Sequence, residues 1–265
     1  MTTIGSTTPL LSAVLAPLTD LGRADAVARR ITEAIALGLV ADGYQLPSEN
    51  DLADQLGVAN GTLREALALL RDAGLIETRR GRNGGSFVRT PAEGSGRLQL
   101  ARLRELGTVE LRDLGDEELA VAGTTARLAA ERAPADLADR LTRLVAALRD
   151  ARTPAELRRA DARFHIELAV AAQSVRLTQL AVRLQAELGP LLWLPAPYAP
   201  DQERFAEQHR EILVAVVAGD GPGARAAAEA HTVACVHHLV RGHLELTDAA
   251  GSSRPASPTF LSERS

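Results

Sequence analysis

The sequence predicts a mainly α-helical protein with two parts, an N-terminal winged helix-turn-helix and a C-terminal all-α antiparallel helical bundle. Apolar residues recur at helical spacing on both sides of a short stretch rich in Gly, Pro and Ser at 90–96. Two short alternating segments flank the glycine-rich "GRNGG" at 81–85. From 98 to 246 the pattern is nearly all helical, which indicates a bundle.

Length and composition favour two domains, because 265 residues with 46% hydrophobic content can bury two ordinary cores. We expect a flexible N-terminal tail at 1–22, a winged helix-turn-helix at 23–90, a linker at 91–97, an all-helical domain at 98–246 and a flexible C-terminal tail at 247–265. The opening "TTPLLSAVLAPLTDLG" is too short and too interrupted to cross a bilayer. The expected location is cytoplasmic, with no membrane partner.

Charge and cysteine content narrow the function classes. The net charge is −4 and all 30 basic residues are arginine, so any surface for a polyanion must be a local patch. Cys235 is the single cysteine, which excludes an intrachain disulfide. Its apolar helical context favours a buried structural thiol over a nucleophile.

Three helices are expected before the linker. The first, Arg23 to Leu39, repeats apolar residues at helical spacing. Ser48 stands three residues before Asp51 in a capping-box arrangement, which starts a short second helix that stops at Gly57. The third runs from about Asn60 to Ala73, and "GVAN" between the second and third has helix-turn-helix spacing. The segments "LIETRR" and "SFVRT" around "GRNGG" then form a hairpin, the wing.

The third helix and the wing form the candidate nucleic-acid surface. A helix fits the major groove, where side chains of its first turn reach base edges and its backbone amides approach phosphate. Arg64 is the leading candidate for this contact. The wing adds Arg79, Arg80, Arg82 and Arg89 within eleven residues that contain no acid. The alternative is a protein-interaction module whose arginines form a solvated face.

The segment "LPSENDLADQLGVANGTLREALALLRDAGLIETRRGRNGGSFV" resembles the winged helix-turn-helix of the GntR family of bacterial transcription regulators. The resemblance covers about 23–90 and implies DNA contacts from Arg64 and from the wing around 82–85. The chain departs from the family at Asn50, where an arginine is usual, and at Asn60 and Gly61, where a basic or hydroxyl residue is common. Asparagine pairs with adenine but does not bind guanine as arginine does, so base preference is expected to differ. The candidate DNA-contacting residues are Ser48, Asn50, Asn60, Gly61, Thr62, Arg64, Arg79, Arg80, Arg82, Asn83, Gly84 and Gly85.

Four polar residues interrupt the apolar pattern of the bundle. Asp161 and His165 are four residues apart and share a helix face, as two ligands of one metal can. His209 lies about ten residues before the turn "GDGPG" and His231 about ten after it, which places both at one depth of a helical hairpin. Their convergence predicts a site for a divalent transition metal, with zinc, nickel and manganese equally compatible. Taken singly, each histidine is better explained as a core or surface group, and only the joint spacing favours a shared site.

The segments "DARFH", "EQHREILVAVVAGD" and "AAAEAH" resemble the metal-ligating segments of the FCD effector domain of the FadR-type branch of that family. The resemblance implies a homodimer and a small carboxylate effector bound beside the metal. The chain departs from the family at two points. Glu118 stands where the family usually has an arginine that pairs with the carboxylate, and Arg112 is nearby but not at the aligned position. After the first ligand helix, "QSVR" replaces a small "GN". Arg112 and Arg183 remain the candidate effector-binding residues. These departures favour a less acidic effector, or none.

The mechanism expected from this resemblance is a transcription regulator, by default a repressor. Two chains would pair on an inverted repeat of double-stranded DNA, and an effector beside the metal would change the spacing of the two DNA-reading parts. One alternative keeps DNA binding but makes the bundle a dimerisation block with a structural metal or none. Another is a metal-dependent hydrolase or lyase, but Glu167 and Glu211 face away as general bases, so no enzyme is expected. The "WLPAPYAPD" segment around Trp193 is interpreted as a stiff surface loop with one aromatic anchor, or alternatively as the lid of a pocket.

Overall fold

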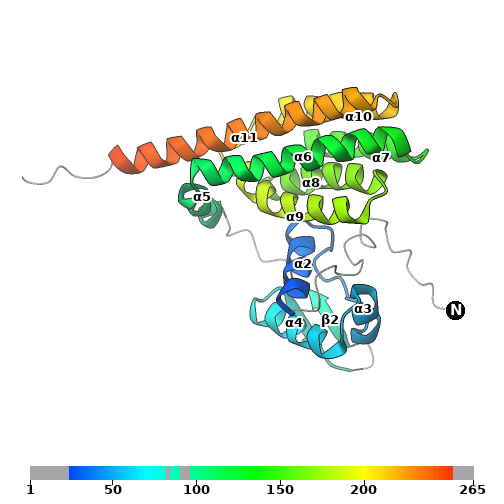
Figure 1. Cartoon of the computed structure of the whole chain (residues 1–265). Helices are drawn as coiled ribbons and strands as arrows, with labels where there is room; N and C mark the ends of the chain where they lie inside the picture. The colour runs from blue at the N-terminus through cyan, green and yellow to red at the C-terminus, as the bar shows by residue number, and fades with distance from the viewer. Residues whose placement is uncertain (1–23, 82–83, 90–95, 253–265) are drawn as a thin grey trace, which may run out of the picture.

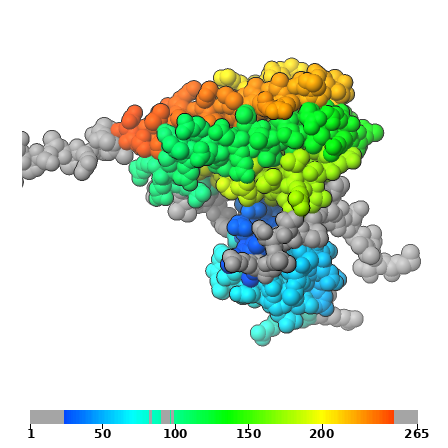
Figure 2. Space-filling view, in the orientation of Figure 1, coloured from blue at the N-terminus to red at the C-terminus, as the bar shows by residue number. Residues whose placement is uncertain are grey.

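The computed structural model describes residues 24–81, 84–89 and 96–252, and within them helices dominate. Figure 1 shows two parts: a small N-terminal part, here called the head, lies beneath a layered stack of long helices, here called the bundle. In space-filling view the head projects from one side of the bundle (Figure 2). This arrangement agrees with the predicted fold class. No helix within the described residues is long and apolar enough to span a membrane.

The head contains the three predicted helices. They are α2 (Ala24–Ala36), α3 (Glu49–Leu56) and α4 (Asn60–Asp72). The Ser48 hydroxyl accepts a hydrogen bond from the Asp51 amide at 3.2 Å and donates one to the Asp51 carboxylate at 2.6 Å. Ser48 is therefore the expected N-cap. The Asp51 carboxylate accepts from the Ser48 hydroxyl, whereas in a full capping box it would accept from the Ser48 backbone amide. Gly57 closes α3 with φ of 67°, a conformation that favours glycine.

The wing is a two-stranded antiparallel hairpin of β1 (Ile76–Arg79) and β2 (Gly85–Val88). Its register pairs Ile76 with Val88 and Arg79 with Gly85. A Cβ added at Gly84 would lie 2.5 Å from the Arg79 carbonyl oxygen, so only glycine fits the turn without a backbone shift. The short turn between the two strands therefore depends on the glycines of "GRNGG", as predicted.

The bundle contains seven helices within the described residues. The two longest, α6 and α11, pack along each other, while α10 packs on α7 and α11, and α8 packs on α7 and α9. Their bounds are α5 Gly96–Glu105, α6 Thr108–Arg132, α7 Leu137–Asp150, α8 Pro154–Ala171, α9 Val175–Leu192, α10 Gln202–Val217 and α11 Gly221–Ser252. This packing buries the apolar faces that the periodicity predicted.

The head and the bundle share one hydrophobic core. Ala162 and Ile166 of α8, both fully buried, belong to the same cluster as the buried residues of α2, α3 and α4. The Arg163 guanidinium donates a 2.7 Å hydrogen bond to the Gly38 carbonyl at the end of the α2 region. Helix α2 also contacts α9. The head therefore rests directly on α8 and α9, so a displacement of either helix would disturb their shared core.

Two expected boundaries need correction. Helix α11 continues to Ser252, so residues 247–252 of the expected C-terminal tail are helical, with the Thr247 hydroxyl bonded to the His243 carbonyl at 3.0 Å. Helix α5 begins at Gly96, two residues inside the expected linker. Trp193 is completely buried and packs edge-on against Phe205 at 5.7 Å between ring centroids, as the aromatic anchor of its segment and not as part of a lid.

Helix α8 begins with a complete capping box. The Thr153 hydroxyl accepts from the Glu156 amide, and the Glu156 carboxylate accepts from the Thr153 amide at 3.0 Å and from the Arg152 amide at 2.8 Å. Since these bonds satisfy otherwise unpaired helix donors, Thr153→Ala is expected to lower the free energy of unfolding by about 1 kcal/mol. Urea denaturation followed by circular dichroism measures this change. Thr153→Ser, which keeps the hydroxyl, should stay near the wild-type value, and equal losses in both variants would contradict a capping role.

Candidate metal centre and DNA-reading surface

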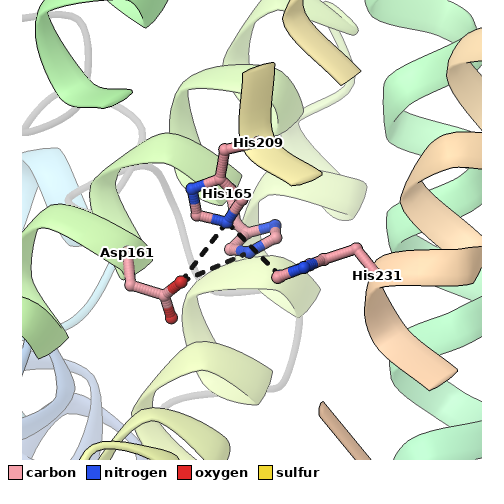
Figure 3. A group of neighbouring side chains, drawn as sticks. All are labelled: Asp161, His165, His209 and His231. Atoms are coloured by element: carbon pink, nitrogen blue, oxygen red, sulfur yellow. Dashed lines mark hydrogen bonds and ion pairs between the residues drawn. The ribbon is translucent and has the colours of Figure 1, made fainter. Parts of the chain in front are cut away.

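Asp161, His165, His209 and His231 converge at one point inside the bundle. Figure 3 shows the four side chains pointing toward one another from α8, α10 and α11. One potential ligand atom from each residue lies within 4.8 Å of the corresponding atoms of the other three. Two of the separations are 3.3 Å between Nε2 of His209 and Nε2 of His231, and 3.4 Å between Nε2 of His209 and Oδ1 of Asp161.

The sequence produces this convergence in two ways. The four-residue step on α8 places Asp161 and His165 on one face, with His165 Nε2 at 3.9 Å from Asp161 Oδ1. The α10–α11 hairpin then brings His209 and His231 to the same depth, as their equal distances from the turn predict. All four residues are buried. The structure therefore brings together the four predicted metal ligands.

The three imidazoles are electrically neutral at neutral pH. Burial lowers the pKa of His165 to about 4, and it lowers the pKa of His209 and of His231 well below the usual value, helped by the neighbouring histidines. His231 Nδ1 lies 3.0 Å from the Gln208 side-chain oxygen, so it carries the proton and leaves Nε2 free as an electron-pair donor. Nδ1 of His209 has no comparable partner within the described residues.

The donor set fits a divalent transition metal. Asp161 Oδ1 is buried with no hydrogen-bond partner within the described residues, and burial raises the pKa of Asp161 to about 7 despite the nearby Trp193 side chain. A buried carboxylate oxygen beside three neutral imidazoles calls for a cation. Metal–nitrogen distances of about 2.0–2.1 Å give ligand separations of roughly 3.3–3.4 Å around a tetrahedral ion, close to the two separations that involve His209, while Asp161 and His165 lie 3.9 Å apart. Nitrogen and oxygen donors of this kind suit zinc, nickel and manganese.

A small cavity of about 20 Å³ lies beside the cluster. Glu118 contributes one wall: its Oε1 accepts a 3.0 Å hydrogen bond from the Gln185 amide, while Oε2 is buried without a partner within the described residues. Burial raises the pKa of Glu118 to about 7. Cys235 also lines the cavity, with Sγ at 3.5 Å from His231 Nε2, and burial raises the pKa of its thiol. The residue as a whole is half-buried.

Glu118 should make the stability of the metal-free protein depend on pH. Because its folded pKa is about 7 and its ordinary value is 4.5, the folded state loses stability as pH rises from about 4.5 through 7. Glu118→Gln removes this loss. The variant should gain stability relative to the wild type between pH 5 and pH 8, by on the order of 3 kcal/mol. Urea titrations of both metal-free proteins across this range measure it, and parallel pH profiles would show that Glu118 ionises freely.

The two arginines expected to bind an effector lie elsewhere. Arg112 is exposed on α6. Arg183 is paired with Glu117 and Glu187, and burial of its side chain is incomplete. Neither arginine belongs to the described residues that line the cavity. Both assignments therefore lack support from the geometry, because the cavity wall facing the cluster carries Glu118 where a carboxylate-binding arginine was expected.

The predicted DNA-reading residues of the helices lie on accessible parts of the head. Arg64 projects from the first half of α4 and its Nε donates to the Glu49 carboxylate of α3 at 2.8 Å, with the Arg64 side chain 69% exposed. Such an exposed ion pair has little net energy, so exchanging it for a DNA contact costs little. Thr62 is half-buried, and the remaining predicted positions on α3 and α4 are exposed, namely Ser48, Asn50, Asn60 and Gly61.

The wing places two arginine groups around Glu77. Arg79 donates to Glu77 at 2.7 Å and lies over the Phe87 ring at 4.3 Å, while Arg89 donates to the other Glu77 oxygen. These arginine bonds lower the pKa of Glu77. Arg80 is exposed, and Gly84 and Gly85 form the turn side of β2. Arg82 and Asn83, also predicted DNA contacts, lie outside the described residues.

Several residues of the site escaped the sequence patterns. Gln208 orients His231, Gln185 pairs with Glu118, and Trp193 lies beside Asp161. His243, given no role from sequence, is buried, and its Nδ1 donates to the Leu103 carbonyl at 3.0 Å. None of these has a spacing signature, since each partner comes from a different helix. The sequence drew attention to Glu118, as the residue aligned with the missing arginine, and to Trp193, but it predicted neither of these contacts.

A winged helix-turn-helix joined to a helical domain with a buried histidine and aspartate cluster defines a DNA-binding transcription regulator. The chain matches the model for "Bacterial regulatory proteins, gntR family" over residues 23–88 and the FCD domain model over residues 119–234. It belongs to the GntR family, in the branch that carries a C-terminal FCD domain. The predicted family is confirmed.

Relatives cover nearly the whole chain. The putative HTH-type transcriptional regulator RmpR of Mycobacterium gastri is 44% identical over 253 residues, covering 95% of this chain and 92% of that protein. The putative L-lactate dehydrogenase operon regulatory protein of Escherichia coli is 33% identical over 216 residues, covering 78% of this chain and 82% of that protein. A solved GntR family regulator from Pseudomonas syringae has a TM-score of 0.45 at 19% identity, covering 91% of this chain and 95% of that one. The family and these relatives are transcription regulators and not enzymes.

Proposed function

We propose that this regulator binds an operator through α4 and the wing, and that a small-molecule effector bound beside a divalent metal in the bundle controls that binding. The observation that carries the proposal is the position of α8. One face of this helix holds Asp161 and His165 of the cluster, and its other face holds Ala162 and Ile166 in the core shared with the head. A structural change at the cluster can therefore be transmitted to the head through α8 alone.

The four cluster residues would hold the metal, and their chemistry supports this role. A divalent ion binds neutral imidazoles and an ionised carboxylate, and burial already keeps the three imidazoles neutral. A bound ion would supply positive charge and an open coordination position beside the cavity that Glu118 lines. Gln208 would keep His231 oriented toward that ion, and Phe164, stacked on His209 at 4.1 Å, would keep that ring in place.

We propose further that the chain acts as a homodimer on an inverted repeat. Two recognition helices in successive major grooves require two heads at a fixed spacing, which one chain does not supply. Binding over a promoter would exclude polymerase, so repression is the proposed direction of control. As a DNA-binding regulator, the protein would act at the nucleoid.

The second candidate function keeps the DNA binding and assigns the bundle to dimerisation alone. It is favoured by the absence of an arginine among the described residues that line the cavity, because a carboxylate effector would lack its counter-charge there. The two candidates differ in one measurable property. In the sensor, operator affinity depends on the metal and on a small molecule; in the dimerisation block it depends on neither.

The test measures operator affinity by fluorescence anisotropy, using a DNA site selected from genomic fragments with the purified chain. Metal-free, zinc-loaded and nickel-loaded proteins are titrated with this site, alone and with pools of small metabolites grouped by charge. The sensor predicts that at least one pool changes the affinity of the metal-loaded protein and leaves that of Asp161→Ala unchanged. If neither metal nor any pool changes the affinity, the bundle is a dimerisation block.

A further inference from the structure

The cavity beside the cluster has an acidic and unsatisfied wall. Glu118 is only 6% exposed and lines the cavity with Gln185, which already bonds its Oε1. Oε2 has no hydrogen-bond partner within the described residues. A buried carboxylate oxygen left in this state is costly, so it creates a demand for a hydrogen-bond donor from a ligand.

No cationic side chain of the described residues meets that demand, because the other ionisable residues that line the cavity are Asp161, His165 and His231 of the cluster and Cys235. The residues of the described chain that line the cavity include no arginine, and the sequence contains no lysine. Arg183 is engaged by Glu117 and Glu187 outside the cavity. A second cavity of about 120 Å³ lies next to the first, since both are lined by Thr232 and Val236. Its ionisable lining residues are Asp116 and His237.

The two cavities differ in size, so each suits a different part of a ligand. The inner cavity of about 20 Å³ has room for one group of the size of water, which is also the size of an ammonium group. The neighbouring cavity of about 120 Å³ has room for a few carbon atoms. Its walls include Leu119, Val233 and Val236, which suit a short aliphatic body.

We propose that the effector of this chain carries a primary ammonium group, which the Glu118 carboxylate binds in the inner cavity while a short aliphatic body occupies the outer one. The proposal rests on the proposed function, because it takes this cavity to be the effector site. The unpartnered Oε2 accepts from the ammonium group, and Gln185 keeps the carboxylate in position. A carboxylate of the same size would meet Glu118 as a like charge and bind more weakly.

Calorimetric titration of the full chain, metal-free and zinc-loaded, tests this with two probes of equal length, n-propylamine hydrochloride and sodium propionate. We expect propylamine to bind at least about tenfold more tightly than propionate. Glu118→Gln, which keeps the shape but removes the charge, should weaken propylamine binding by roughly tenfold to a hundredfold. Glu117→Gln is the matched control, since this neighbouring carboxylate pairs with Arg183 and does not line the inner cavity. Its affinity for propylamine should equal that of the wild type.

Three results would overturn the proposal: propionate binding as tightly as propylamine, propylamine binding that survives Glu118→Gln, or no binding of either probe at millimolar concentration. The second result would show that the amine reaches the metal or another surface. The comparison of probes in the wild type needs no variant, so it remains decisive if Glu118→Gln fails to fold. Operator titrations separate this proposal from the proposed function. Propylamine that binds through Glu118 but leaves operator affinity unchanged removes only the regulatory role, whereas an operator response to carboxylates alone removes only the ligand class.

Discussion

Arg64→Ala is expected to weaken binding to the selected operator by roughly tenfold to a hundredfold. Arg64 lies in the first half of α4, the part of a recognition helix that meets base edges, and its side chain is 69% exposed. A guanidinium in this position can bond two acceptors of one guanine, which alanine cannot replace. Fluorescence anisotropy against the operator and a scrambled duplex measures the loss. Discrimination between the two duplexes should fall together with affinity.

Arg71→Ala is the matched control for this prediction. Arg71 is exposed and lies on the same helix, but in its last turn, away from the end that enters the groove. Removing its charge should lower the affinity for both duplexes equally and by a few-fold at most, as expected for a non-specific electrostatic effect. An unchanged operator affinity in Arg64→Ala, or equal losses in both variants, would mean that α4 does not read the bases through Arg64.

The second large effect is expected at the cluster. Asp161→Ala and His209→Ala should each lower the affinity for zinc more than about a hundredfold, because even partners that only orient a metal ligand contribute roughly tenfold to a hundredfold. His209 Nε2 and Asp161 Oδ1 lie 3.4 Å apart, so either truncation opens the site. Elemental mass spectrometry of protein purified without a nickel column should find about one divalent ion per wild-type chain, lost in both variants.

Thermal unfolding gives an independent measure of the same event. Since an ion that binds only the folded state stabilises it, added zinc should raise the Tm of the wild type and leave that of both variants unchanged. His237→Ala is the control, because His237 is an exposed histidine on α11 outside the cluster. It should retain the ion and the Tm increase. A wild type that takes up no zinc, nickel or manganese would exclude the metal-dependent mechanism and leave DNA binding intact.

The sequence was most informative where local geometry determines the structure. The Ser48 cap, the Gly57 stop and the hairpin at 81–85 depend on neighbours within a few residues, so residue type and spacing suffice to predict them. The convergence of the four cluster residues was also predictable, because an α-helix fixes which residues share a face and a hairpin fixes which residues share a depth. His165 and His231 could therefore be placed together without knowledge of the rest of the bundle.

The remaining features depend on contacts between distant segments. Burial of Trp193 requires Phe205 from the following helix, and the role of His243 requires the Leu103 carbonyl of α5. Residues 247–252 looked like a tail because they are small and polar, yet the long helix that precedes them continues through them. No periodicity encodes such pairings, since the partner of each side chain is set by how helices pack.

The length of α11 has a mechanical consequence. Its 32 residues make a rod of about 48 Å, with His231 in the cluster and His243 twelve residues further on, or about 18 Å along the axis. The ring of His243 ties this rod to Leu103 in α5, the first helix after the connection from the head. Helix α5 is thus held at a fixed distance from the cluster along α11. Shortening or lengthening α11 between the two histidines by one residue would turn one of them about 100° away from its partner.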